Sequence, residues 1–171
     1  MLLVVCDSTP LIYLARLGRF DLLRQLYELV LIPQAVWHEV AVKGAQFVEG
    51  TAVQVAVKAG WMRVETPVGH LQVSPSEAED LDPGEEEALQ LAIERDAMIA
   101  IDESHGRDVA KRLGLRITGT VGILVRARHE GVIPALAPEL ARLRQTTFRV
   151  SEAVIREALA RVGETAKPFT S

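Results

Sequence analysis

The 171-residue sequence contains a single cysteine, Cys6, and aromatic residues make up only 5% of it. One cysteine cannot form a disulfide within the chain, and Cys6 lies in an apolar run, so we expect a buried thiol with no catalytic role. No apolar run reaches the roughly 18 residues that span a bilayer, and the first residues lack the basic flank and cleavage site of a secretory signal. We therefore expect a cytoplasmic protein with no membrane partner.

Neither basic nor acidic residues are in large excess. The sequence has 19 Lys and Arg against 23 Asp and Glu, which gives a formal net charge of -4. This balance disfavours a broad basic surface for nucleic acid and is compatible with a local one. Hydrophobic residues make up 49% of the chain and charged residues 25%, as in ordinary globular proteins, and the length suits one domain with a full core.

Strand-like and helical patterns alternate along the chain, which predicts a parallel sheet covered by helices. We expect a three-layer α/β/α fold with a central parallel sheet of four to five strands and extra C-terminal helices. The predicted strands are 1–6, 29–32, 61–65, 97–101 and 115–117. The predicted helices are 10–27 with a break at Gly18, 33–43, 48–59, 82–94, 106–113, 119–128, 134–144 and 151–162, while 67–83 is expected to be a polar surface excursion and 165–171 a frayed tail.

An acidic residue, Asp7, directly follows the first predicted strand. Thr9 and Pro10 have the pattern of an N-cap and a first helical residue, so the strand must end near Cys6. This places Asp7 at the carboxyl end of the strand, which is the edge where open α/β sheets bind ligands. Taken alone, Asp7 could equally serve as a turn or capping residue.

Other acids are expected at the same edge of the sheet. Asp102 and Glu103 follow the fourth predicted strand as Asp7 follows the first, and three acids, Glu85 to Glu87, begin the helix before it. A single acid at a helix N-terminus is explained by its favourable interaction with the helix dipole, but three consecutive acids are more than this interaction requires. With Glu39 these carboxylates would repel one another unless a cation neutralised them, and hard oxygen donors suit Mg²⁺ or Mn²⁺. Such a cluster suits two-metal cleavage of a phosphodiester.

Five segments, in order, resemble the PIN-domain family, and specifically its branch of predicted nucleic-acid-binding, VapC-type toxin-related proteins. The segments are Val4 to Ile12 (VVCDSTPLI), Ile32 to Val40 (IPQAVWHEV), Pro83 to Ala88 (PGEEEA), Ile101 to Glu103 (IDE) and Thr118 to Gly122 (TGTVG). The resemblance covers roughly residues 1 to 135 and implies a PIN-like domain there. Residues 136–171 are then expected to form C-terminal helices packed on the same domain.

The resemblance implies a metal site formed by four catalytic acids. Asp7, Glu39, Glu87 and Asp102 match the family's ligands, and Glu85 and Glu103 are secondary candidates. A shift of one helical position would replace Glu87 with Glu86, and the spacing before Asp102 is shorter than in the usual toxin pattern. Ser8 and Thr120 are candidates for contact with substrate phosphate or a metal-bound water, with capping as the alternative.

The function implied is a Mg²⁺- or Mn²⁺-dependent endoribonuclease that cleaves single-stranded or structured RNA, as the toxin of a toxin–antitoxin pair. Its expected partners are RNA, a small antitoxin protein and a second copy of the chain. One alternative is a catalytically silent PIN-fold module that binds nucleic acid or protein. A phosphoryl-transfer enzyme of another α/β family is a third hypothesis, although Thr9 stands where a phosphatase needs a second Asp. His105 is a weaker candidate proton donor. The candidate RNA-binding cations are Arg16, Arg19, Arg24, Arg107, Lys111, Arg112, Arg126 and Arg128.

Overall fold

The computed structural model describes residues 2–165. Contacts within the chain divide it into two compact units, Met1–Thr120 and Val121–Ser171. This division precedes the expected boundary at residue 135, and the packing of the C-terminal helices on the first unit stays a prediction. The expected frayed tail was placed at 165–171, and all of it after Thr165 lies outside the described residues.

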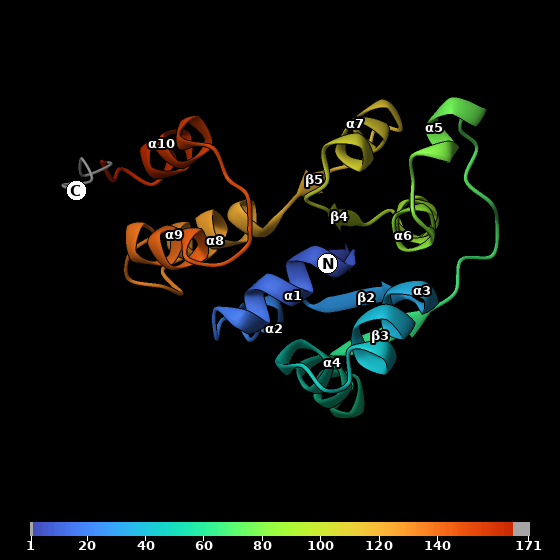
Figure 1. Cartoon of the computed structure of the whole chain (residues 1–171), viewed down its shortest axis with the longest axis horizontal. Helices are drawn as coiled ribbons and strands as arrows, with labels where there is room; N and C mark the ends of the chain where they lie inside the picture. The colour runs from blue at the N-terminus through green and yellow to red at the C-terminus, as the bar shows by residue number, and fades with distance from the viewer. Residues whose placement is uncertain (1, 166–171) are drawn as a thin grey trace. The chain divides into compact units, whose positions relative to one another are not determined.

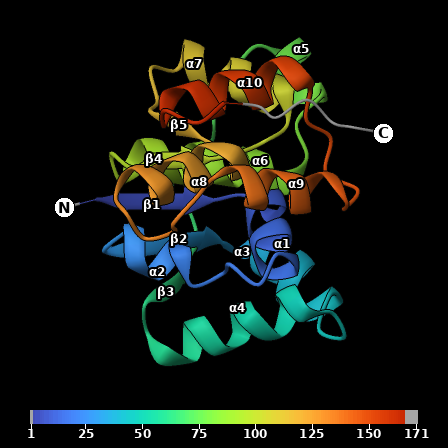
Figure 2. The same ribbon diagram turned by 90° about the vertical axis from the view of Figure 1, so that its left-hand side faces the viewer.

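The N-terminal unit is built on a five-stranded parallel sheet, as the sequence predicts. The strands are β1 (Leu3–Cys6), β2 (Leu29–Pro33), β3 (Met62–Glu65), β4 (Met98–Ala100) and β5 (Ile117–Thr118). Their order across the sheet is β3-β2-β1-β4-β5, and every neighbouring pair is parallel. Figure 2 shows β1 between β4 and β2. Because the chain moves outward from β1 first through β2 and later through β4, the order reverses between β1 and β4.

Helices connect these strands. In the N-terminal unit they are α1 (Ser8–Arg16), α2 (Leu22–Leu26), α3 (Gln34–Trp37), the π-helix η1 (His38–Lys43), α4 (Val48–Ala59), α5 (Pro75–Glu79), α6 (Pro83–Glu94) and α7 (Ser104–Arg112). The C-terminal unit contains α9 (Ala137–Arg144), α10 (Glu152–Arg161) and all of α8 (Thr120–His129) except its first residue. No helix within residues 2–165 is both long enough and apolar enough to cross a bilayer.

The two faces of the sheet pack against different helices of this unit. Val5, Ile99 and Ile101 join Leu91 of α6 and Val109 of α7 in one buried cluster. Neighbouring strand residues point to the opposite face, where α1 and α4 pack against each other and α4 lies against β3. Figure 1 shows α1 and α6 on opposite sides of the strands. Burial on both faces explains why the strands are continuous apolar runs.

The first helix begins two residues before the predicted start. Its N-cap is Asp7, and α1 starts at Ser8, so the prediction of Thr9 as the N-cap is wrong. Pro10 falls at the third helical position, which costs no helical hydrogen bond because the first four N–H groups of a helix have no partner within it. The earlier start places Ser8 in the first turn, directly beside the end of β1.

Two further segments differ from the sequence prediction. The single helix expected over 33–43 consists of α3 followed by the wider turns of η1, which ends at Gly44. The polar stretch 67–83 contains a short helix, α5, whose capping box joins Ser74 and Glu77. Ser74 and Glu77 have the spacing of that motif, so this helix was detectable in the sequence.

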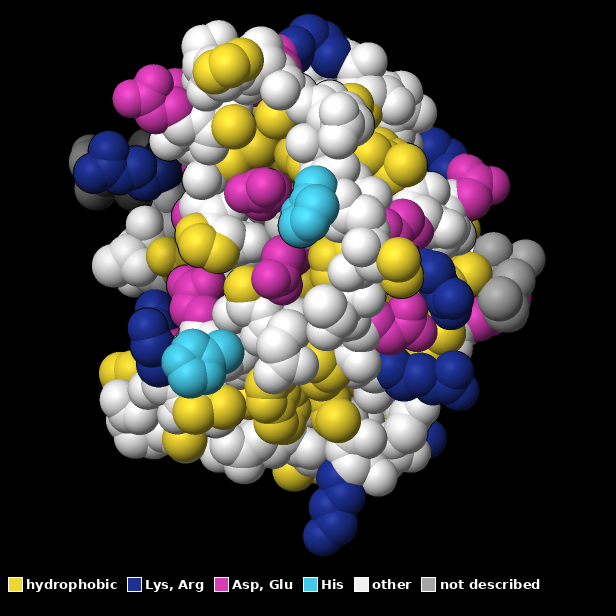
Figure 3. All heavy atoms as spheres, turned by 90° about the vertical axis from the view of Figure 1, so that its right-hand side faces the viewer, with side chains coloured by type: hydrophobic (Ala, Val, Ile, Leu, Met, Phe, Trp, Pro, Cys, Tyr) yellow, Lys and Arg dark blue, Asp and Glu magenta, His cyan; other side chains and the backbone are white. Residues whose placement is uncertain are grey.

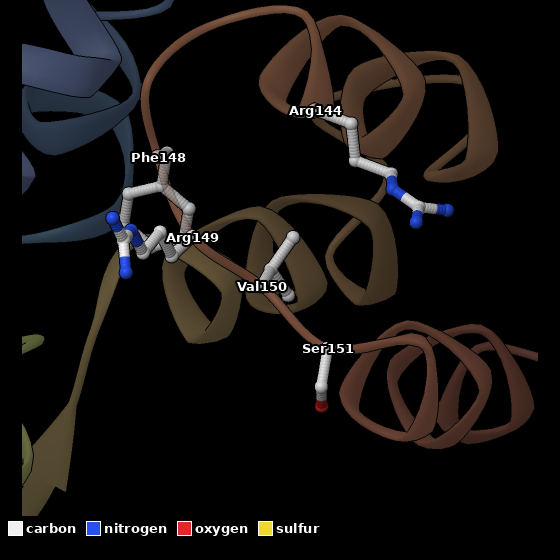
Figure 4. Close-up of a pocket in the computed structure, with 5 residues that line it drawn as sticks. All are labelled: Arg144, Phe148, Arg149, Val150 and Ser151. Atoms are coloured by element: carbon white, nitrogen blue, oxygen red, sulfur yellow. The ribbon is translucent and has the colours of Figure 1, made fainter.

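The C-terminal unit has a hollow of about 450 Å³ at the end of α9 and the start of α10. Its lining residues are Arg144, Phe148, Arg149, Val150 and Ser151. Ser151 caps α10 by accepting a hydrogen bond from the backbone N–H of Val154. In Figure 4 the guanidinium groups of Arg144 and Arg149 extend to opposite sides, so this hollow has no converging set of cations.

Candidate functional site

Asp7 and Asp102 lie at the carboxyl ends of the two strands between which the sheet order reverses. Cys6 pairs with Ala100 in the β1–β4 register, and the Asp7 N–H donates to the Ala100 carbonyl at 3.0 Å. Asp102 is two residues beyond Ala100. The crevice beyond such a reversal point is the usual ligand site of open α/β sheets. Burial and both nearby carboxylates raise the pKa of the intervening Cys6, so its thiol stays protonated and buried.

Asp7 is a buried carboxyl group surrounded by other acids. Its residue is only 5% exposed. The pKa of Asp7 is raised to about 8, with burial as the largest cause; a backbone hydrogen bond from Ser8 opposes the rise, and the charges of Asp82, Glu85 and Glu39 add to it. Burial and the three acidic neighbours therefore both oppose ionisation of this carboxyl group.

Glu39 approaches the same region from η1. Its Oε2 accepts a hydrogen bond of 2.6 Å from the Ser8 hydroxyl, and its charge contributes to the raised pKa of Asp7. Glu39 is exposed and Ser8 is buried. Ser8 therefore ties the start of α1 to the predicted ligand Glu39, and a direct contact of Ser8 with substrate stays a prediction.

The acids at the start of α6 have different hydrogen-bond partners. Asp82 and Glu85 form a capping box, in which each side chain accepts from the backbone N–H of the other. A methyl group built on Gly84 would lie 3.3 Å from Asp82 Oδ1 and 3.4 Å from Asp7 Oδ1, so both carboxylates approach one point. Glu87 instead accepts a 2.9 Å hydrogen bond from the Ala35 N–H at the start of α3.

Glu85 is buried, and it interacts electrostatically both with Asp7 after β1 and with Glu103 after β4. Burial raises the pKa of Glu85; the hydrogen bond from the Asp82 backbone lowers it, the charges of Asp82 and Glu103 raise it, and His105 lowers it. Glu103 caps α7 by accepting from the Gly106 N–H at 3.0 Å. His105 is directed to the Glu77 carbonyl, with Nε2 at 3.0 Å.

Asp102 is held by Thr120, the first residue of α8. Thr120 donates to it twice, from its N–H to Oδ1 at 2.8 Å and from its hydroxyl to Oδ2 at 2.6 Å. Burial raises the pKa of Asp102, and the Thr120 hydrogen bonds and the Arg107 charge oppose that rise. Arg107 Nη1 also donates to the carbonyls of Ile101 and Thr118, which joins the ends of β4 and β5.

Replacing Thr120 with valine is expected to destabilise the protein by about 1–2 kcal/mol, because Asp102 Oδ2 loses its donor while the buried shape is retained. Thr120 has no exposed surface, so water cannot replace the lost hydroxyl from that side. Urea unfolding measures the change. Thr120→Ser is the control that keeps the hydroxyl, and a valine variant as stable as the serine variant would contradict this role for the hydrogen bond.

The donor set fits a hard divalent cation chemically. The groups near Asp7 are carboxylates, which are the hard oxygen donors that Mg²⁺ and Mn²⁺ prefer. Within residues 2–165, however, no three Asp, Glu, His or Cys side chains converge closely enough to hold one ion. Several of the acids accept hydrogen bonds from the protein instead, so joint coordination requires side chains to turn toward Asp7. The four-residue ligand set therefore stays a prediction.

Half of the eight candidate RNA-binding cations pair with acids. Arg16 pairs with Glu49, Arg112 with Glu77, Arg126 with Glu130 and Arg128 with Glu164. Arg107 holds the strand ends described above. Arg24 and Lys111 are exposed. The pairs of Arg112, Arg126 and Arg128 are partly exposed and weak, so these arginines can exchange a carboxylate for a phosphate at small cost. Arg16 differs, because its partner Glu49 is buried and would be left unpaired.

Sequence reasoning missed two residues of this site. Asp82 was seen only as the start of a helix, and Arg107 only as one surface cation among several. The capping-box spacing of Asp82 and Glu85 could have indicated that these two side chains meet. No local pattern predicts that Arg107 spans β4 and β5, because that contact depends on how the strands pair.

Comparison with known proteins agrees with the architecture. The PIN-domain family DUF3368 matches residues 3–164. The solved structure of a PilT N-terminus domain protein, SSO1118 from the hyperthermophilic archaeon Sulfolobus solfataricus P2, has 15% sequence identity and a TM-score of 0.40 over 88% of this chain and 100% of that chain. No curated protein matches the sequence.

The family match gives the fold a general functional class. A PIN domain is a fold of the nuclease type and typically uses divalent metals. The match spans nearly the whole chain, including both strand-end acids and the start of α6. The chain therefore belongs to the PIN-domain family DUF3368.

Proposed function

We propose that the chain is a divalent-metal-dependent endoribonuclease whose central metal ligand is Asp7. The observation that carries the proposal is the burial of Asp7 at the reversal point of the sheet, among Asp82, Glu85 and Glu39. A buried carboxyl with acidic neighbours destabilises the fold when it ionises, and a bound cation removes that cost. The family match supports nuclease chemistry of this type.

Asp7, Glu39 and Asp102 would hold Mg²⁺ or Mn²⁺ together with an acid from α6. Glu87 is the predicted acid, and the charge of Glu85 on Asp7 supports Glu85 as its competitor. The bound ions would supply positive charge to the phosphate and lower the pKa of an attacking water. Ser8 orients Glu39, and Thr120 with Arg107 orients Asp102, so these three act as positioning residues.

One observation favours the second candidate, a PIN-fold module that binds nucleic acid or protein without cutting it. In the described part of the chain the acids do not converge into a group of three. If they cannot turn toward one ion, the fold would bind without catalysis. The two functions therefore differ in whether metal draws the acids together.

The test is cleavage of a mixed pool of single-stranded and hairpin RNA by the purified full chain. We expect internal cuts with Mg²⁺ or Mn²⁺ and none with EDTA. The matched pair Glu85→Gln and Glu87→Gln then identifies the ligand from α6, since its loss should lower the rate by at least about tenfold. An intact protein that cuts no RNA in either metal would favour the binding module.

The toxin role and its partners are separate proposals that rest on the sequence resemblance. We expect expression of the chain to arrest growth, and a small protein to co-purify with it as antitoxin. Relief of arrest by Asp7→Asn would tie toxicity to the acidic site, whereas arrest that persists in this variant would contradict that link. Gel filtration of the purified chain tests the expected homodimer.

A further inference from the structure

A hollow of about 260 Å³ lies beside the candidate site, between α6 and the segment that leaves β3. One wall is formed by Pro67, His70 and Leu71, and the other by residues of α6 from Pro83 to Gln90. Figure 3 shows the face that bears α5 and α6, on which acidic and histidine side chains lie close together. The hollow belongs entirely to the N-terminal unit.

The hollow adjoins the proposed metal site through Glu87. This residue lines the hollow, and its Oε2 accepts from the Ala35 N–H at the start of α3. The same stretch of chain continues into η1, where Glu39 lies. A ligand in the hollow would therefore be next to an acid of the proposed site.

The acidic side chains that line the hollow, Glu86 and Glu87, are hydrogen-bond acceptors. Glu86 lines it and has no side-chain partner among residues 2–165. Gln90 donates one Nε2 hydrogen to Glu94 at 2.8 Å, so its amide keeps a second N–H and its carbonyl oxygen for a ligand. The ionised Glu86 carboxylate only accepts hydrogen bonds and therefore selects ligands that present N–H donors.

The remaining walls offer flat and apolar surfaces. Pro67, Leu71 and Pro83 supply apolar contact, and the exposed ring of His70 has no side-chain partner within the described residues. Unstacked RNA bases are commonly bound by stacking on such rings while their Watson–Crick edge is hydrogen-bonded. The lining thus combines an apolar surface with an acceptor edge, as a nucleobase requires.

The loop wall is fixed in position before any ligand binds. Glu94 accepts from the N–H groups of Val68 and Gly69 at 3.0 and 2.7 Å, which fastens the loop to α6. Hydrogen bonds from Gln90 and from these two backbone groups lower the pKa of Glu94. A fixed wall reduces the ordering cost of binding, so the hollow is suited to select one ligand shape.

We infer that this hollow is a base-specificity pocket for one unstacked guanine of the RNA substrate, with Glu86 as its specificity-determining residue. Guanine presents two adjacent donors, the ring N1–H and the exocyclic amino group, and these match the two oxygens of a carboxylate. Adenine presents an acceptor where guanine has N1–H, so Glu86 would repel it. The inference rests on the proposed function, because that function supplies the RNA.

The experiment is cleavage of a random-sequence RNA library by the full chain with Mn²⁺, followed by sequencing of the cut ends. We expect one position near the cut to be enriched in guanine. In Glu86→Gln the ratio of guanine to adenine at that position should fall by at least about tenfold, the loss expected of one bidentate base contact. The matched control is Glu79→Gln, the same substitution at an exposed residue of α5, and it should keep the ratio.

Failure of this inference can be told apart from failure of the proposed function. Cleavage without a guanine preference, or with one that Glu86→Gln leaves unchanged, overturns the pocket while the nuclease stands. If the wild type cuts no RNA, the pocket is tested by binding instead. Guanosine and adenosine 5′-monophosphates are each titrated into the protein, and the NMR signal of the His70 ring reports binding. At least about fivefold tighter binding of the guanosine nucleotide, lost in Glu86→Gln, supports the pocket, and equal or absent binding overturns it.

Discussion

Replacing Asp7 with asparagine is expected to abolish metal-dependent RNA cleavage and, in the absence of metal, to make the protein more stable. The rate should fall by at least about a hundredfold, because the variant lacks the proposed central metal ligand. Stability should rise by about 1–3 kcal/mol at pH 8 and above, since asparagine fills the same buried position without a charge. For a chain of this length that corresponds to a thermal midpoint higher by several degrees.

The pH dependence of this stabilisation follows from the pKa of Asp7. Burial and acidic neighbours raise it from 3.8 to about 8. A group with a raised pKa contributes its full stability below pH 3.8, where it is protonated in both states, and that contribution is lost as the pH rises to about 8. The wild type should therefore lose stability relative to Asp7→Asn between pH 5 and pH 8, as thermal unfolding in EDTA measures.

Divalent metal should reverse this order. Mn²⁺ that binds the folded state raises the thermal midpoint of the wild type in proportion to the logarithm of its concentration, and Asp7→Asn should not respond. Asp108→Asn is the matched control, because it makes the same change at an exposed residue of α7. An Asp7→Asn variant that is less stable than the wild type at pH 8 in EDTA would contradict the raised pKa.

Replacing Gly119 with alanine is expected to displace Asp102. The added methyl would lie 2.6 Å from Asp102 Oδ1, 2.9 Å from Arg107 Nη1 and 3.2 Å from the Ile101 carbonyl. The first two distances are shorter than atoms tolerate, so the carboxylate and the guanidinium must move. We expect cleavage to fall by about a hundredfold and stability by about 1–3 kcal/mol, which is the usual range for an overpacked buried site.

A double-mutant cycle shows whether this loss acts through Asp102. If alanine at position 119 lowers the rate by moving that carboxylate, adding it to Asp102→Asn should cause little further loss of activity. Independent effects would instead multiply. A Gly119→Ala variant with the wild-type rate would show that the position of Asp102 is not needed for cleavage.

The sheet could be predicted from the sequence because its signals are local. Runs such as Leu29–Pro33 are apolar throughout, as strands buried on both faces must be, and this strand ends at Pro33, one residue beyond its predicted end. The helix over Val48–Ala59 was predicted with its observed bounds, since Gly60 provides the left-handed cap. Alternation of such elements determined the fold class.

The details of the site were less predictable because they depend on contacts between distant segments. Periodicity cannot reveal that Glu87 turns to Ala35, or that Thr120 gives both of its donors to Asp102. The π-helical turns of η1 also change the direction of Glu39 relative to a regular helix. Asp7 and Asp102 could be placed together since each directly follows a strand, and neighbouring parallel strands end at one edge.

The most direct test of the proposed metal site is an anomalous difference map from crystals of the full chain soaked in Mn²⁺. We predict a peak bonded to a carboxylate oxygen of Asp7 and to at least one of Glu39, Glu85, Glu87 and Asp102, at a metal–oxygen distance of about 2.0–2.2 Å. At saturating Mn²⁺, a map with no peak within coordination distance of Asp7 would contradict its assignment as the central ligand.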